Sequence, residues 1–226
     1  MGIPFHVLEI TFTPEPEQLL AKLALDADSS EAEDFLALLE RAAPLAQPRA
    51  AIGTVRVDSR EDSGRVVLGG VEFSSALLAK NFAGAETVWP YIASCGRELY
   101  DFVMAIADPF ERFWGDAIMQ QALTDVRAAL DSHLAENIYS GKTAYMGPGQ
   151  LPEWPIAQRV PLFRLLGEAP ARCGVTLTET MLMLPNKSVS GIRFPNEHGY
   201  VSCRLCPKER CAHRKAPYEP EMSDHA

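Results

Sequence analysis

The sequence lacks any apolar run that approaches the roughly 20 residues of a membrane span. Its N-terminus also lacks a basic stretch followed by an apolar one, so no secretory signal is expected. Positive charge is scarce, since 21 Lys and Arg stand against 30 Asp and Glu, for a net charge of −9. Neutralising a phosphate backbone requires clustered Lys and Arg, so this balance argues against a nucleic-acid-binding protein. We therefore expect a cytoplasmic protein that binds neither membrane nor nucleic acid.

Several common catalytic signatures are also missing. The sequence contains no HExxH motif, and it shows no Ser-His-Asp arrangement. The segment 187–191 is similar to an anion-holding turn, but it lacks the first glycine of a P-loop at the required spacing, so phosphate transfer is not expected. Two interpretations stay open for this segment: a polar turn before a strand, or a ligand-binding role for Lys187 and Ser188.

Cysteine is sparse, but three of the five cysteines crowd into nine positions, at Cys203, Cys206 and Cys211. In a reducing compartment this pattern indicates metal binding or redox chemistry rather than disulfides. A zinc site or an iron–sulfur cluster usually takes a fourth ligand. Cys95 is the preferred one, because it is predicted to lie at a strand-to-helix turn. The other candidates are Cys173, His198 and His213. The alternative is a set of free, partly buried thiols that bind no metal.

The chain as a whole has the composition of an ordinary globular protein, with 226 residues, 47% apolar and 23% charged. The residues from 108 to 138 show the longest helical periodicity and predict a central core helix. Ser30 is expected to cap a helix together with Glu33. Strands are expected over 4–13, 50–57, 65–73, 86–94, 175–178 and 191–194, and helices over 17–25, 30–41, 74–82, 98–106, 108–138 and 156–166.

A loop rich in glycine and proline is expected over 141–154. Within it, Gly147-Pro148-Gly149 has glycines whose missing side chains let the backbone approach a ligand closely. Most segments of this composition are simply turns, so the loop alone does not define a site.

The order of these elements resembles the reactivation domain of cobalamin-dependent methionine synthase, and more closely the small stand-alone relatives of that domain. The resemblance covers about residues 86 to 215, and residues 1–85 carry none of it. The matching segments are Cys95-Gly96, Glu98-Leu99, 108–125, Gly147-Pro148-Gly149, Trp154-Pro155, Gln158, Leu162-Phe163, Gly174-Val175, Leu177-Thr178, Met183, Pro185 and 187–191. We accordingly expect an N-terminal α/β portion over 1–85 that packs on the same domain, a core over 86–216, and a disordered tail over 217–226.

The resemblance implies a mixed α+β fold, with a central twisted antiparallel sheet wrapped by helices, and S-adenosylmethionine binding along the glycine loop. In the family this loop has an Arg before its Pro-Gly and a Tyr just after, and Tyr145 and Gln150 hold these places here. Asp125 matches an acidic helix position that could hold the amino group of the ligand. The residues expected at the cofactor are Tyr145, Gly147, Pro148, Gly149, Gln150, Trp154, Asp125, Lys187 and Ser188.

By the same resemblance, the function is to assist the reductive reactivation of a corrinoid methyltransferase such as methionine synthase. In the family, an inactive cob(II)alamin is reduced by one electron and remethylated from S-adenosylmethionine. The implied partners are a corrinoid-dependent methionine synthase or another corrinoid protein, and an electron donor such as ferredoxin or flavodoxin. Two alternatives stay open: a non-catalytic module that binds corrinoid proteins, and an iron–sulfur electron carrier that uses the C-terminal cysteines.

Overall fold

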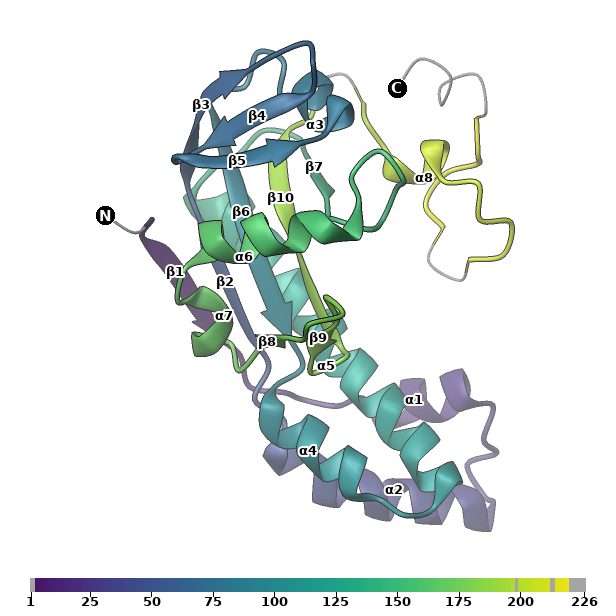
Figure 1. Ribbon diagram of the computed structural model, residues 1–226. Coiled ribbons are helices and arrows are strands. Elements are labelled where there is room, and N and C mark those ends of the chain that lie inside the picture. Colours follow the sequence, from purple (N-terminus) through teal and green to yellow (C-terminus); the bar gives the residue numbers. More distant parts are fainter. Residues whose placement is uncertain (1–2, 198, 212–213, 220–226) are drawn as a thin grey trace.

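A computed structural model describes residues 3–197, 199–211 and 214–219, and its centre is an eight-stranded antiparallel sheet (Figure 1). The strand order is β1-β2-β6-β3-β4-β5, and β10 pairs with both β6 and β7. A separate two-stranded sheet joins β8 to β9. The bounds are β1 (Phe5–Glu9), β2 (Arg49–Gly53), β3 (Val55–Arg60), β4 (Arg65–Leu68), β5 (Val71–Ser74), β6 (Thr87–Ser94), β7 (Thr143–Met146), β8 (Thr176–Leu177), β9 (Met183–Leu184) and β10 (Ser188–Pro195).

Helices cover both faces of the sheet and extend beyond one end of it (Figure 1). The long helix α5 crosses one face and continues past the sheet, where it packs against α1, α2 and α4. The helix α6 lies on the other face. The bounds are α1 (Pro16–Leu23), α2 (Ser30–Ala42), α3 (Ala76–Asn81), α4 (Arg97–Ala105), α5 (Pro109–Asn137), α6 (Arg159–Leu166), α7 (Ala169–Arg172) and α8 (Ser202–Leu205), with short 3-10 turns η1 (Ala43–Leu45) and η2 (Ile156–Gln158).

The sheet separates two hydrophobic cores, and β6 contributes to both because its side chains alternate in direction. Trp89 and Tyr91 enter the core that the sheet shares with α1, α2, α4 and α5. Val88 and Ile92 enter the opposite core, which α3, α6 and Trp154 complete. A strand buried on both faces is apolar throughout, and this explains the continuous apolar run that predicted β6.

The expected central helix is confirmed, since α5 runs from Pro109 to Asn137. The Asp108 carboxylate caps its first turn and accepts hydrogen bonds from the N–H groups of Phe110 (2.8 Å) and Glu111 (3.0 Å). Pro109 occupies the first helical position, where a missing N–H costs nothing. For α2 the predicted cap is wrong by one residue: Ser29 rather than Ser30 accepts from the N–H of Ala32.

Two predicted strands are divided. The strand expected over 50–57 is interrupted at Thr54, although β2 and β3 both pair with β6. The strand expected over 65–73 is a hairpin that turns at Gly69-Gly70, where both residues have positive φ. A Gly-Gly pair between two apolar runs favours such a turn, because glycine adopts positive φ without steric cost.

Two predictions in the C-terminal half are corrected as well. The loop expected over 141–154 begins with the strand β7. The segment 188–191 is not a turn before a strand but the first half of β10, and Ser188 pairs with Ser94 of β6. Both serines are buried, and the Ser188 hydroxyl donates to the Ser94 oxygen (3.0 Å). This internal partner explains how Ser188 is accommodated in a buried strand.

Strands from 1–85 and from 86–216 share the one central sheet. The tail predicted to be disordered, 217–226, lies outside the described residues from 220 onward. Among the helices of the described ranges, none combines the length and apolar character needed to span a membrane.

Candidate ligand site at the strands β7 and β10

The glycine loop after β7 is closed by its own hydrogen bonds. The Gly147 N–H donates to the Gln150 side-chain oxygen (3.1 Å), and the Gln150 N–H donates to the Gly147 carbonyl (3.1 Å). The Gly149 N–H donates to the Trp154 carbonyl (2.8 Å). These bonds hold 147–154 in one fixed turn at the end of the sheet.

The glycines of this loop are required by the packing of the chain itself. A Cβ on Gly147 would lie 2.7 Å from the carbonyl oxygen of Ser190, and one on Gly149 would lie 3.2 Å from the Ile156 side chain. Pro148 is buried, and Trp154 is 0% exposed in the core, edge-on to Phe73. The sequence suggested that the glycines make room for a ligand, but most of the loop faces protein instead. Within 147–154, the exposed residues are Gly149, Gln150 and Pro152.

Tyr145 lies in β7 and is separated from this loop by Met146. Its ring lies among three cationic side chains. It pairs across the strands with Arg193 of β10, and side chains opposite each other in a sheet share a face. The Arg193 guanidinium lies 5.3 Å from the centre of the Tyr145 ring. The Arg127 guanidinium from α5 lies 5.8 Å from it, and the Lys215 ammonium lies 5.5 Å from it. Each distance is short enough for attraction between the cation and the aromatic ring.

Arg193 is buried, with 6% of its surface exposed, and it forms an ion pair with Asp131 of α5. Its guanidinium also lies 5.4 Å from the ring centre of Tyr91. The Nε atom of Arg193 is buried and has no hydrogen-bond partner in the described part of the chain. Burial raises the pKa of the Tyr91 hydroxyl to about 12, even though Arg193 and Arg127 favour its ionised form. The cluster is therefore a partly desolvated group of cations around two tyrosine rings, and the Tyr91 hydroxyl among them stays neutral.

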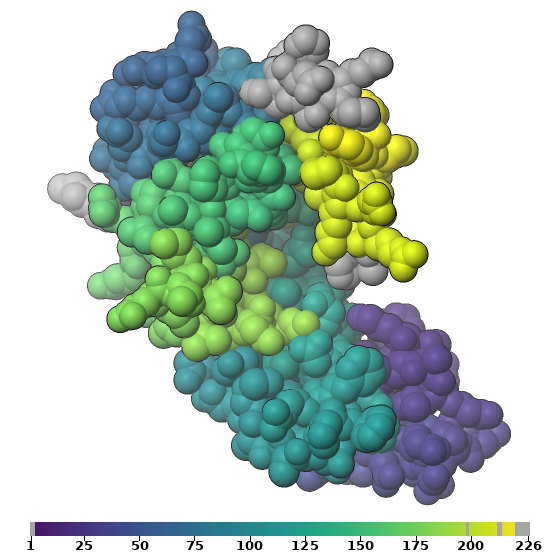
Figure 2. Space-filling model, turned by 45° about the vertical axis from the view of Figure 1, so that its right-hand side comes forward, coloured from purple at the N-terminus to yellow at the C-terminus, as the bar shows by residue number. Residues whose placement is uncertain are grey.

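A cleft of about 190 Å³ opens beside this cluster. Tyr145 and Lys215 line it together with Tyr200 and Cys203 of the C-terminal segment. Figure 2 shows this segment, in yellow, as a ridge beside the green and teal surface. Burial raises the pKa of the Tyr200 hydroxyl.

The remaining residues expected at the cofactor lie elsewhere. The Lys187 ammonium pairs with Asp116 (2.8 Å). Lys187 lies just before the first residue of β10, whereas Arg193 lies near the last residue of that strand. Ser188 is buried against Ser94. Asp125 accepts a hydrogen bond from Gln121 (2.6 Å), and burial, with a smaller contribution from Glu15, raises the pKa of its carboxyl group. The structure does not bring Lys187, Ser188 or Asp125 to the cleft beside Tyr145.

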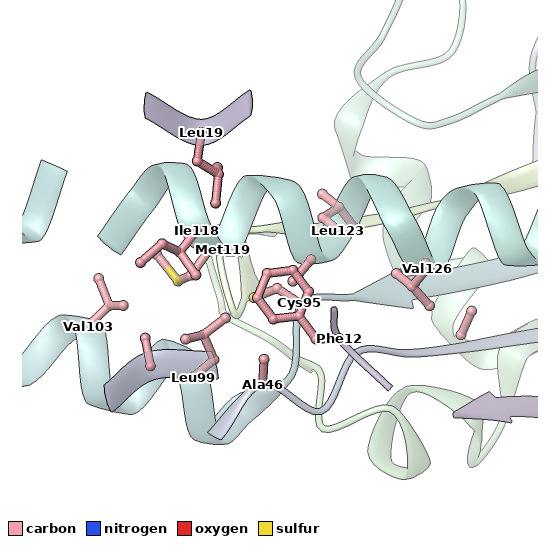
Figure 3. Close-up of a cluster of buried hydrophobic side chains, with 14 of the residues drawn as sticks. Phe12, Leu19, Ala46, Cys95, Leu99, Val103, Ile118, Met119, Leu123 and Val126 are labelled. Carbon is pink, nitrogen blue, oxygen red and sulfur yellow. The ribbon is translucent and has the colours of Figure 1, made fainter. Parts of the chain in front are cut away.

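The preferred fourth metal ligand, Cys95, does not meet the other cysteines. It is 0% exposed, and Figure 3 shows it under α5 beside Phe12, inside a hydrophobic cluster. Burial raises the pKa of its thiol to about 12, and the same holds for Cys173. A thiol held protonated in an apolar core is a poor metal ligand, because the thiolate is the form that binds. The choice of Cys95 from its position at the turn is therefore not supported.

Cys203, Cys206 and Cys211 are partly exposed. No group of three His, Cys, Asp or Glu side chains converges within the described ranges, and His198 and His213 lie outside them. The segment is arranged around Arg214, whose guanidinium donates to the carbonyls of Cys203, Cys206, Lys208 and Ala216. The described residues thus do not fit a zinc ion or an iron–sulfur cluster.

The sequence predicted Tyr145 but missed Arg127, Asp131 and Arg193. The signal for Arg193 was a single charged residue in the apolar strand Ile192-Arg193-Phe194. A charged residue at such a position is rarely buried unless it is paired.

The described residues form a mixed α+β domain in which a partly buried cluster of Arg and Tyr adjoins a cleft at one edge of the sheet. The fold matches solved structures, among them one described as "Crystal Structure of the MetH Reactivation Domain bound to AdoHcy". The TM-score is 0.59 and the sequence identity is 15%, over 89% of this chain and 82% of that chain.

The family described as "Vitamin B12 dependent methionine synthase, activation domain" matches residues 116–215. Residues 116–215 are thus similar to that activation domain, as the sequence predicted, and the mixed α+β fold of the chain with a central antiparallel sheet is confirmed. No curated protein matches the chain.

Proposed function

We propose that this chain binds S-adenosylmethionine and acts in the reductive reactivation of a corrinoid methyltransferase such as methionine synthase. The observation that carries the proposal is the family match over 116–215, a range that includes the glycine loop, Tyr145 and Arg193. The similar fold of a reactivation domain that binds AdoHcy supports it. S-adenosylmethionine supplies the methyl group that cobalamin of the partner protein receives after a one-electron reduction.

The described residues fit such a ligand in part. The cleft of about 190 Å³ is smaller than the roughly 300–1,000 Å³ of pockets that enclose a whole small molecule. It therefore accommodates the amino-acid portion, and the adenosine portion extends over the exposed Gly149 and Gln150. In this role the chain does little chemistry of its own, because its residues position the methyl donor against the cobalt of the partner.

An anaerobic remethylation assay tests this function. A corrinoid methyltransferase that lacks its own reactivation domain is prepared with cob(II)alamin and mixed with S-adenosylmethionine and a chemical one-electron reductant. Adding this chain should produce methylcobalamin, recorded by its visible absorbance, at least about tenfold faster than the mixture without it. A rate that the chain leaves unchanged, across several corrinoid partners, contradicts the proposal. The physiological electron donor, such as ferredoxin or flavodoxin, is a separate question that a chemical reductant avoids.

A second candidate is a module that binds corrinoid proteins without catalysis. The observation that favours it is the closed glycine loop, in which the Gln150 side chain occupies the Gly147 N–H. Calorimetry separates the two candidates, because this module binds a corrinoid protein but gives no heat with millimolar S-adenosylmethionine. The third possibility, an iron–sulfur electron carrier, receives no support from the described residues.

A further inference from the structure

We infer that Cys203 and Cys206 form a redox-active pair of thiols, which a small-molecule disulfide such as oxidised glutathione converts reversibly to an intrachain disulfide. This inference goes beyond the proposed function, because it concerns the sulfur chemistry of the chain itself and needs no bound S-adenosylmethionine. The pair lies at the short helix α8, and Cys203 lines the cleft beside Tyr145.

The two cysteines lie at opposite ends of a single turn. Cys203 belongs to α8, and Cys206 follows the last residue of this helix. The Cys206 N–H donates to the Cys203 carbonyl (3.4 Å), and a turn closed in this way brings the two Cα atoms within about 7 Å. Disulfides join Cα atoms that are about 4.4–6.8 Å apart, so this separation suits a disulfide.

Neighbouring residues hold this turn in place. The Arg214 guanidinium donates to the carbonyls of Cys203 (3.1 Å) and Cys206 (3.3 Å), one at each end of the turn. Leu205, between the two cysteines, is buried in the core that α6 and Trp154 complete. Because the two residues are held together before they react, forming the bond costs little further conformational freedom.

The five cysteines differ in how a reagent can reach them. Cys203 is partly exposed and lines the cleft, where its Sγ accepts a hydrogen bond from the Lys215 N–H (3.3 Å). Cys206 is partly exposed but also packs against the core. Cys95 and Cys173 are 0% exposed. A disulfide in solution therefore meets Cys203 first, and Cys206 is placed to complete the reaction.

The charge of the C-terminal segment suits an anionic oxidant. Residues 199–219 contain five Lys and Arg against two Glu, for a net charge of +3, whereas the whole chain carries −9. A local excess of positive charge raises the concentration of anions at a surface. Oxidised glutathione is an anion at neutral pH because of its carboxylates, so it fits this segment better than a neutral disulfide would.

The reaction balances in two exchange steps. The Cys203 sulfur attacks one sulfur of oxidised glutathione, and one molecule of reduced glutathione leaves with the thiol proton. The Cys206 sulfur then attacks the mixed disulfide at Cys203, and a second molecule of reduced glutathione leaves. The two cysteines lose two protons and two electrons in total, and oxidised glutathione gains them.

A redox titration of the whole chain tests the inference. The chain is purified without oxygen, reduced, and equilibrated with mixtures of reduced and oxidised glutathione. Acid stops the exchange, and the remaining thiols are alkylated. Mass spectrometry of the peptides should show a disulfide between Cys203 and Cys206 whose fraction rises from none to nearly all across the mixtures. Cys95 and Cys173 should stay reduced throughout, because they are buried.

Three serine variants make the test specific. Cys206→Ser cannot complete the second step and should accumulate one glutathione on Cys203. In Cys203→Ser, Cys206 should gain glutathione at least about tenfold more slowly than Cys203 does in Cys206→Ser, because it does not line the cleft. Cys211→Ser is the matched control and should titrate as the wild type does, since Cys211 lies outside the α8 turn.

Several results would overturn the inference. They are a disulfide between Cys203 and Cys211, a disulfide between two chains, and free thiols in the most oxidising mixture. Stoichiometric zinc or iron that protects these cysteines from alkylation in the chain purified without oxygen also overturns it, because they would then be metal ligands. Each of these results leaves the proposed function standing, and a failed remethylation assay leaves the redox pair standing.

Discussion

The burial of Arg193 could not be predicted from the sequence. The pattern around it predicts a strand, and this is correct, but nothing local predicts that an arginine in that strand is 6% exposed. Its burial depends on Asp131, which is 62 residues away in the chain, and on the rings of Tyr91 and Tyr145. Tyr145 was predicted at the candidate site only from the resemblance, because it holds the place of the family's Arg before the glycine loop.

The ion pair between Arg193 and Asp131 gives the first prediction. Asp131→Asn leaves the buried guanidinium without its anionic partner, and we expect unfolding free energy to fall by about 1–2 kcal/mol. Asp116→Asn removes the partner of the more exposed Lys187 and should cost less than about 1 kcal/mol. Urea denaturation of both variants measures these changes. Equal losses would show that Arg193 does not depend on its partner.

The five cysteines should differ in thiol reactivity, because two are buried and three are partly exposed. Burial raises the pKa of Cys95 and Cys173 to about 12, so neither forms the reactive thiolate near neutral pH. In the native protein at pH 8, iodoacetamide should modify the partly exposed Cys203, Cys206 and Cys211 and leave Cys95 and Cys173 intact, as mass spectrometry would record. Labelling of Cys95 as fast as Cys203 would contradict its place in the core.

Asp125 gives a prediction for pH. Burial raises the pKa of its carboxyl group above the unfolded value, so the folded chain holds this proton more tightly. The protonated form is favoured on folding, and this contribution is lost as pH rises through the folded pKa. Asp125→Asn should therefore melt at a higher temperature than the wild type at pH 7, with a smaller difference at pH 3. A lower melting temperature at pH 7 would mean that the charged carboxylate is stabilising.

At the scale of elements, the long helix and the buried strand β6 were predictable and β10 was predictable only in part. The helix α5 is predicted by Asp108-Pro109 at its start and by an apolar stripe along its length. The first half of β10 contains Ser188 and Ser190, and the hydrogen bond of Ser188 to Ser94 inside the sheet cannot be predicted from the sequence. A polar segment with an internal partner has the same composition as a turn.

Gly191 tests how β7 and β10 are held together. A Cβ at this position would lie 2.1 Å from the Met146 carbonyl oxygen of the adjacent strand. Gly191→Ala should therefore lower the unfolding free energy by at least about 2 kcal/mol and weaken ligand binding, because Tyr145 follows the displaced strand. Gly70→Ala is the comparison, since its Cβ meets nothing within 4 Å and only its positive φ causes strain. It should cost about 1–2 kcal/mol without any change in binding. Unchanged binding by Gly191→Ala would separate the site from this strand pair.

At the scale of the molecule, the sheet brings together residues that are far apart in the chain. Ser188 pairs with Ser94, and Arg193 lies opposite Tyr145. Composition and periodicity predicted a mixed fold, and the resemblance predicted the arrangement of its sheet. Neither the periodicity nor the resemblance predicted that Lys187 and Asp125 lie away from Tyr145. Their positions depend on how α5 lies along β10. The glycine loop was correctly located in the chain, but its packing could be seen only in three dimensions.

A crystal structure of the chain with S-adenosylmethionine tests the central claim most directly. We expect the ligand in the cleft that Tyr145, Tyr200 and Lys215 line, in contact with these side chains. A ligand bound instead next to Lys187 and Asp116, or a cleft that stays empty at saturating ligand, would contradict this account.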